Sequence, residues 1–278
     1  MPPLPSWCGG IAARMEGLNA RVLAGREAGL SAPSGLCFWR GGILVADMDN
    51  RRVVWMKPDG GIVPLDGNAP PLEKPLALAA DETCVWVADA VQKALWRWQA
   101  GEWRKLASPA ALSPALTLPG GVALSDRGEL YFTDFLTNRI CRRTPCGEYS
   151  VIKGIDCEKP YGLCLQGDEV YLTDNARGRI LCYSQAREKY DVLFERGEGW
   201  SPIALAASSD GWLYISTGRT LSRLSLSLGR WEPVVDALAW RELGLGKLCH
   251  LGAIAAKPGR IVVSDTIRSN VVELILAQ

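Results

Sequence analysis

Two nearly identical charged elements hold the residues best suited to acid–base chemistry. Glu73-Lys74-Pro75 and Glu158-Lys159-Pro160 each place a carboxylate beside an ammonium group. A carboxylate can take or give a proton at a substrate, and an ammonium group can bind an anion. Solvated loop charges ahead of a strand-starting proline account for the same residues without any chemistry, so both interpretations stay open.

Two further polar residues complete the candidate catalytic set. Tyr161 follows the second charged element, and His250 is the only histidine of the chain. A histidine titrates near neutral pH, although a hydrogen-bonded loop histidine needs no such role. The candidate catalytic residues are Glu73, Glu158, Tyr161 and His250.

The single histidine also limits the metals that the chain can hold. A catalytic zinc ion needs three protein ligands, which are commonly histidine nitrogens. We therefore predict no zinc site. No metal ligands and no cofactor are predicted from the sequence, and calcium stays open.

Composition excludes several classes of protein. The 278 residues carry 31 basic and 30 acidic side chains, a net charge of +1, so there is no basic arm and no acidic tail. Hydrophobic residues make up 48% and charged residues 22%, as in a soluble globular protein. No apolar run is long enough to span a membrane, and the first 25 residues do not resemble a signal peptide.

The cysteines suggest a compartment. There are nine, an odd number, and no two form a CxxC pair, while several lie in apolar, strand-like runs. Buried reduced thiols in a cytoplasmic protein explain this pattern. A secreted form whose leader has been removed is the alternative.

A repeat positions all of these residues. Six segments share an apolar run that follows a Pro-x-Gly or Pro-x-Ala element, a turn, and a second run that ends in Asp or Thr. The repeats begin near residues 32, 74, 118, 159, 201 and 250. Their closing residues are Asp47, Asp89, Asp134, Asp174, Thr217 and Asp265, at spacings of 42, 45, 40, 43 and 48 residues. This period is typical of four-stranded propeller blades.

The repeat predicts an all-β fold, a six-bladed β-propeller with four-stranded blades. The domain spans residues 20–278 and follows an N-terminal extension, residues 1–19. The last repeat ends in a third strand at residues 271–276, whereas residues 20–25 match the fourth strand of the other repeats. We therefore predict that the N-terminal strand closes the last blade, which protects its edge. An open solenoid would need polar end caps.

The repeats resemble NHL repeats, in which a second strand ends in Asp and is followed by Asn-Arg-Ile. Residues 134–140 and 47–53 match this pattern best, and the resemblance covers about residues 20–276. It implies a propeller, and propellers of this kind include enzymes, RNA-binding proteins and protein-binding scaffolds. Some similar propellers are lyases or lactonases, and the lactonases often hold a metal at the middle residue of the Pro-x-Gly element. Here these residues are Ser34, Leu76, Gly120, Tyr161, Ile203 and Gly252, and none is a carboxylate or an amide.

Charge is predicted to differ between the two faces of the propeller. The link into the first strand of a blade and the link from its second to its third strand lie on the same face. These links carry the predicted ligand-binding residues: Arg51, Lys74, Lys93, Arg139, Lys159, Tyr161, Arg177, Arg219, His250 and Arg268. The links of the opposite face carry many acids. An arginine five residues after a closing Asp can instead pair with that Asp.

The leading functional hypothesis is a monomeric binding scaffold that recognises an anionic small molecule or a protein on the basic face, around the central channel. The first alternative is an enzyme of the lyase, lactonase or cyclase kind with its site at the channel mouth. The second is an RNA-binding propeller, although Tyr161 and Phe135 are the only expected stacking platforms on that face.

Overall fold

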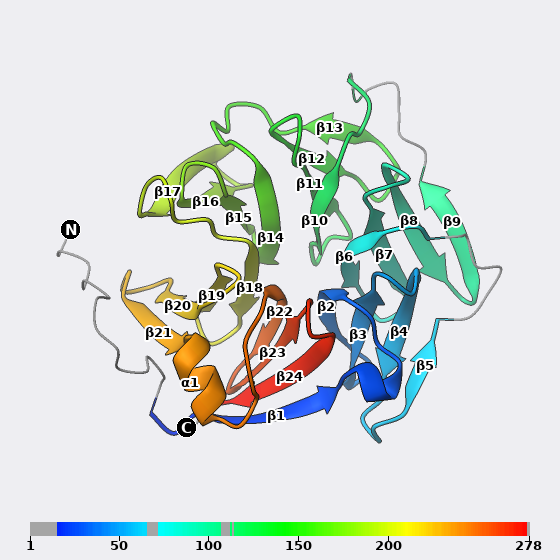
Figure 1. Cartoon of the computed structure of the whole chain (residues 1–278). Helices are drawn as coiled ribbons and strands as arrows, with labels where there is room; N and C mark the ends of the chain where they lie inside the picture. The colour runs from blue at the N-terminus through cyan, green and yellow to red at the C-terminus, as the bar shows by residue number, and fades with distance from the viewer. Residues whose placement is uncertain (1–15, 66–71, 107–111, 113, 277–278) are drawn as a thin grey trace.

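The computed structural model describes residues 16–65, 72–106, 112 and 114–276. Six antiparallel sheets of four strands stand around a central axis (Figure 1), which confirms the predicted six-bladed β-propeller. In five blades the strand nearest the axis is followed outward by the next three strands along the chain, and in the sixth the outermost strand comes from the start of the chain.

The blades follow the chain with one exception. Blade 1 holds β2 (Pro33–Trp39), β3 (Gly42–Asp47), β4 (Arg52–Met56) and β5 (Ile62–Pro64). Blade 2 holds β6 (Pro75–Ala80), β7 (Cys84–Asp89), β8 (Ala94–Gln99) and β9 (Glu102–Leu106). Blade 3 holds β10 (Pro119–Leu124), β11 (Leu130–Asp134), β12 (Arg139–Arg143) and β13 (Tyr149–Val151). Blade 4 holds β14 (Pro160–Gln166), β15 (Glu169–Asp174), β16 (Arg179–Ser184) and β17 (Lys189–Glu195). Blade 5 holds β18 (Ala204–Ser208), β19 (Trp212–Ser216), β20 (Leu221–Ser225) and β21 (Trp231–Val235).

Blade 6 joins the two ends of the chain, as predicted. Its strands β22 (Leu251–Lys257), β23 (Arg260–Asp265) and β24 (Asn270–Ile275) come from the end of the sequence. Its outermost strand is β1 (Asn19–Ala24), which pairs antiparallel with β24. A short 3₁₀ turn, η1 (Arg26–Ala28), then leads from β1 toward blade 1.

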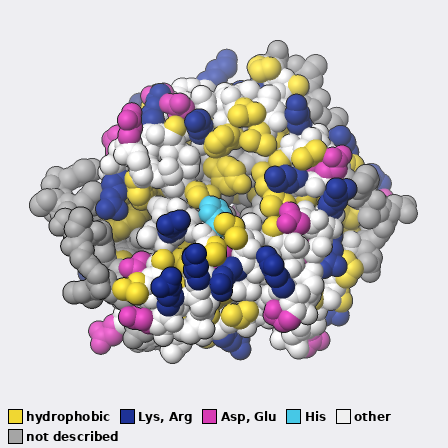
Figure 2. Space-filling view, viewed as in Figure 1, with side chains coloured by type: hydrophobic (Ala, Val, Ile, Leu, Met, Phe, Trp, Pro, Cys, Tyr) yellow, Lys and Arg dark blue, Asp and Glu magenta, His cyan; other side chains and the backbone are white. Residues whose placement is uncertain are grey.

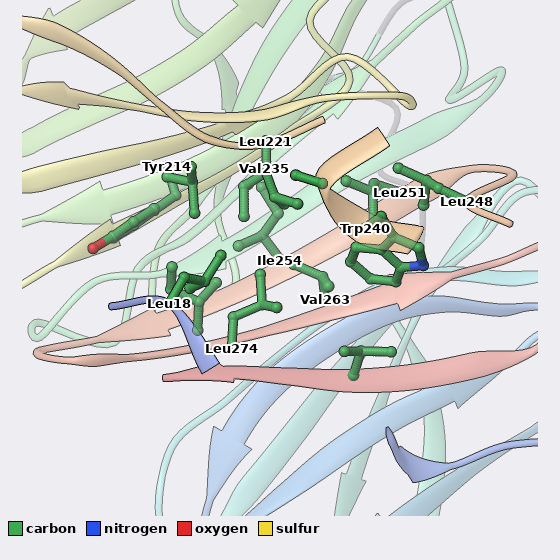
Figure 3. Packing of buried hydrophobic residues seen from close by; sticks show 14 of the residues in the cluster. Leu18, Tyr214, Leu221, Val235, Trp240, Leu248, Leu251, Ile254, Val263 and Leu274 are labelled. Atoms are coloured by element: carbon green, nitrogen blue, oxygen red, sulfur yellow. The ribbon is translucent and has the colours of Figure 1, made fainter. Parts of the chain in front are cut away.

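The apolar core is divided among the blade interfaces. Six clusters of buried side chains are present, and each one packs between two neighbouring blades. Figure 3 shows the cluster between blades 5 and 6, where Leu18 and Leu274 face Tyr214 and Ile254. Because each sheet buries both faces in this way, the strands read as nearly continuous apolar runs.

One helix was not expected from the sequence. α1 (Ala237–Glu242) lies in the link between blades 5 and 6, and Asp236 caps it by accepting hydrogen bonds from the amides of Leu238 and Ala239. Trp240 of this helix is 1% exposed and packs in the cluster of Figure 3. The link between these two blades therefore contributes to the core. In the described part of the chain no helix is long and apolar enough to cross a membrane.

Candidate functional site

Buried aspartates hold the loops of the predicted basic face. Each closing Asp is at most 1% exposed and accepts hydrogen bonds from the backbone of the link into its own blade. Asp89 accepts from the amides of Glu73 (2.7 Å) and Lys74 (3.1 Å). Asp265 accepts from the amide of His250 at 3.0 Å. The backbones of these candidate residues are thus fixed, while their side chains remain at the surface.

Three arginines five residues after a closing Asp are internal partners, as the sequence allowed. Arg139, one of the predicted ligand-binding residues, pairs with Asp134 at 2.8 Å, and its side chain is only 11% exposed. Burial by itself would raise the pKa of Asp134, but hydrogen bonds from Thr117, Arg139 and the amide of Leu118 outweigh it, so the pKa is lowered. Arg52 and Arg179 pair in the same way with the closing Asp of their blades. Arg139 is therefore committed to the fold.

Arg177 is also engaged. Its guanidinium contacts Asp156 at 2.5 Å and Glu158 at 3.7 Å. The second contact pairs Glu158, which the sequence placed among the candidate acid–base residues, with a cation. In blade 2 the matching residue, Glu73, is exposed and makes no ion pair with any described residue.

Six cations of the predicted set remain exposed. In the described part of the chain, their side chains make no hydrogen bond or ion pair. They are Arg51, Lys74, Lys93, Lys159, Arg219 and Arg268. Figure 2 shows the face that carries the lone histidine: basic side chains gather near the central hollow, and acidic ones lie mostly toward the periphery. The closing aspartates are buried beneath this surface, so their negative charges lie under the exposed cations and not beside them.

Three of these cations occupy strained backbone positions. Arg51, Lys93 and Lys159 have φ values of 56°, 51° and 54°. The turn position of Arg51 and Lys93 is filled in other blades by Asn138 and Gly178, which tolerate a positive φ better. Strained residues of this kind gather at functional sites.

The central channel has a neutral wall. A cavity of about 280 Å³ runs between the six innermost strands, and its described lining residues include no carboxylate, amide, imidazole or ammonium side chain. The polar side chains of the wall belong to Ser34, Cys37, Tyr161 and Cys164. Burial raises the pKa of the two thiols to about 12, so they stay protonated and unreactive near neutral pH.

Each innermost strand is also an edge of its sheet. Half of its backbone N–H and C=O groups therefore point toward the axis and supply neutral donors and acceptors to the channel.

The two remaining polar candidates lie at the channel. Tyr161 lines it directly, and burial raises the pKa of its phenol, which keeps the hydroxyl neutral. His250 is half-buried near the centre of the face in Figure 2. Its imidazole packs on Gly218, where a Cβ atom would lie 3.0 Å from Nδ1. A side chain on Gly218 would displace the ring, so this glycine makes room for the histidine.

Exposed aliphatic side chains were missed by the sequence analysis. Val91, Leu136 and Ile267 are 52%, 64% and 60% exposed, and each stands two residues after a closing Asp. This regular spacing was the available signal. The opposite face is more mixed than predicted, since Arg127 and Arg142 pair there with Asp168 and Glu129.

Comparison with known proteins places the chain among six-bladed propellers. No family model and no curated protein matches its sequence. A streptogramin B lyase is 14% identical with a TM-score of 0.70, over 94% of this chain and 98% of that one. A gluconolactonase from Xanthomonas campestris is 16% identical with a TM-score of 0.74, over 95% and 91%. Virginiamycin B lyase from Staphylococcus aureus is 15% identical with a TM-score of 0.66, over 94% and 99%. At these identities the likeness establishes a shared fold.

A divalent-cation site of the kind that the resemblance to lactonases implies does not fit the described residues. Hard cations need several oxygen ligands, mainly carboxylates. The channel wall offers none, and the described residues contain no group of three or more His, Cys, Asp or Glu side chains placed to hold a metal.

Proposed function

We propose that this chain is a binding propeller whose basic face recognises an organic anion at the mouth of the central channel. One observation carries the proposal: six exposed cations without ion pairs in the described structure lie on the face where a channel opens whose wall has no charged side chain. An anion at this mouth gains attraction from the cations and meets no carboxylate in the wall. Such an arrangement raises the rate of encounter and favours anions over cations.

The experiment reverses three cations that make no ion pair with a described residue. We expect Arg51→Glu, Lys93→Glu and Arg219→Glu, combined, to leave the melting temperature nearly unchanged, because exposed charges contribute only about 0–1 kcal/mol to stability. Binding of an anionic probe, anilinonaphthalene sulfonate, should weaken by about tenfold or more, and salt should weaken it in the wild type. Fluorescence titration measures both effects.

A matched control carries the same change of charge elsewhere. Lys57, Lys105 and Lys189 lie in the turn after β4, on the outer strand β9 and at the start of β17. Their combined reversal to Glu should leave binding within about twofold, because salt screens these distant charges. Recognition by the basic face would be excluded if both triple variants lost the same affinity for the probe. It would also be excluded if the affinity depended neither on these charges nor on salt.

A second candidate is catalysis of the lyase or lactonase kind at the channel mouth, with Glu73, Glu158, Tyr161 or His250. The fold of the solved neighbours favours it, whereas the pairing of Glu158 and the neutral channel wall do not. Hydrolysis of gluconolactone, measured with and without added calcium and compared with Glu73→Gln and His250→Gln, distinguishes this candidate from binding alone.

A further inference from the structure

An apolar shelf adjoins the channel mouth between blades 3 and 4. Phe135 and Tyr161 come from different blades, and their rings meet edge to face with centroids 5.9 Å apart. Leu136, the next residue of the same turn, is 64% exposed. A large aliphatic side chain held this far out of the core contributes little to folding, because most of its apolar surface stays in water.

Contacts between the two blades hold the shelf in place. The hydroxyl of Thr133 donates to the carbonyl of Tyr161 at 3.1 Å. The amide of Lys159 donates to the side-chain oxygen of Asn138 at 2.9 Å, which ties the lysine to the turn that carries Phe135 and Leu136. Lys159 keeps a positive φ of 54° and an exposed side chain. The backbone that carries the shelf and its cation is therefore held in place before any ligand arrives, which lowers the entropic cost of binding.

The shelf is continuous with the channel, because Tyr161 belongs to both. Its hydroxyl makes no hydrogen bond to a described residue, and the residue lines a cavity of about 280 Å³ whose wall carries no charged side chain. A cavity of this size suits a small molecule rather than a folded partner. A ligand that complements both features has an apolar part that packs on the shelf and a negative charge that attracts Lys159.

We infer that the shelf of Phe135, Leu136 and Tyr161 binds the apolar body of a small amphipathic carboxylate, whose charged head lies against Lys159. The inference rests on the proposed function and narrows it from organic anions to those with an alkyl or aryl body. The hydroxyl of Tyr161 offers a hydrogen bond to the carboxylate or to a polar group of the body.

The test compares carboxylates that share a head and differ in their apolar part: acetate, hexanoate, decanoate and naphthoate. Isothermal titration calorimetry at fixed salt should show affinity rising up to about fourfold for each methylene group that is buried against apolar surface. Leu136→Ser should weaken decanoate at least about threefold, whereas acetate, which has no body, reports on the head alone. Lys159→Asn, which tolerates the positive φ, should weaken acetate and decanoate by the same factor.

Leu228→Ser is the control, since Leu228 is 77% exposed in the turn after β20, on the opposite face. It should change no affinity. Equal affinities for acetate and decanoate, with both lost in the triple reversal of cations, would overturn the shelf and leave the proposed function standing. If affinity rises with tail length equally in the wild type and in Leu136→Ser, the ligand binds elsewhere and the inference about the shelf is wrong. If none of the carboxylates and no sulfonate probe binds, the proposed function fails together with the inference.

Discussion

At the scale of single residues, basic side chains have two different roles on the same face. Arg139 is held by a buried aspartate, while Lys93 is exposed at a positive φ and has no ion pair with a described residue. The first contact stabilises a turn. The second residue accepts backbone strain that a glycine at this position would relieve, and so its side chain needs a reason beyond folding.

This contrast predicts that stability and binding change in opposite directions. We expect Lys93→Gly and Arg51→Gly to raise the free energy of unfolding by up to about 1 kcal/mol each, because a positive φ costs an ordinary residue about that much. The affinity for anilinonaphthalene sulfonate should fall. Urea unfolding and fluorescence titration measure the two quantities.

Ala100→Gly is the matched control, because Ala100 has a φ of 50° in the turn between β8 and β9, on the opposite face. It should bring a similar gain in stability and no change in binding. If Lys93→Gly and Ala100→Gly affect the probe equally, the lysine does not take part in recognition.

The sequence could predict part of this residue-scale picture. Arg139 stands five residues after Asp134, and this spacing identified it as a possible ion-pair partner of that aspartate. The structure confirms the pair. The exposure of Leu136 was missed, because an apolar residue beside a strand ordinarily points into the core. Its place two residues after a closing Asp, which Val91 and Ile267 share, was the signal that could have shown it.

At the scale of elements, the innermost strands set how closely blades approach. The third residue of the Pro-x-Gly or Pro-x-Ala element faces the next blade. A Cβ atom on Gly162 would lie 2.5 Å from the carbonyl oxygen of Ile203, while Ala77 and Ala204 hold the same place in other blades. The repeat therefore reflects packing at the axis, and each interface has its own spacing.

Gly162→Ala should therefore destabilise the fold by about 1–3 kcal/mol, because the added methyl group meets backbone that cannot move without opening the interface. Gly120→Ala is the comparison, since its nearest neighbour is the side-chain oxygen of Thr133 at 3.0 Å, and it should cost less. Thermal unfolding of both variants decides. Equal melting temperatures would mean that the interface relaxes freely.

The sequence repeat predicted the strands and their order, but it did not predict the helix α1. Six residues are too few to show a helical period, and this helix is held by the cap at Asp236 and by burial of Trp240. Its stability comes from packing against blades 5 and 6, and such tertiary contacts are not contained in a local sequence pattern.

At the scale of the whole molecule, the ring depends on one pairing between the chain ends. Strand β1 adds to β24 across about 250 residues of sequence. Glu273 of β24 is 2% exposed and accepts hydrogen bonds from Arg21 of β1 and Arg260 of β23. This carboxylate therefore links three of the four strands of the closing blade.

The clamp around Glu273 predicts a pH-dependent contribution to ring closure. Burial by itself would raise the pKa of Glu273, but hydrogen bonds from Arg21 and Arg260 outweigh it, so its pKa is lowered. Stability from such a carboxylate is complete above the ordinary pKa of Glu, about 4.3, and is lost as the pH falls through the lowered value. Glu273→Gln should thus lower the free energy of unfolding by about 1–2 kcal/mol near neutral pH, and this gap to the wild type should close in acid.

Glu102→Gln, which removes an exposed pair with Arg104, is the control and should change the free energy of unfolding little at any pH. A gap that is absent at neutral pH, or that widens in acid, would show that Glu273 does not hold the ring closed.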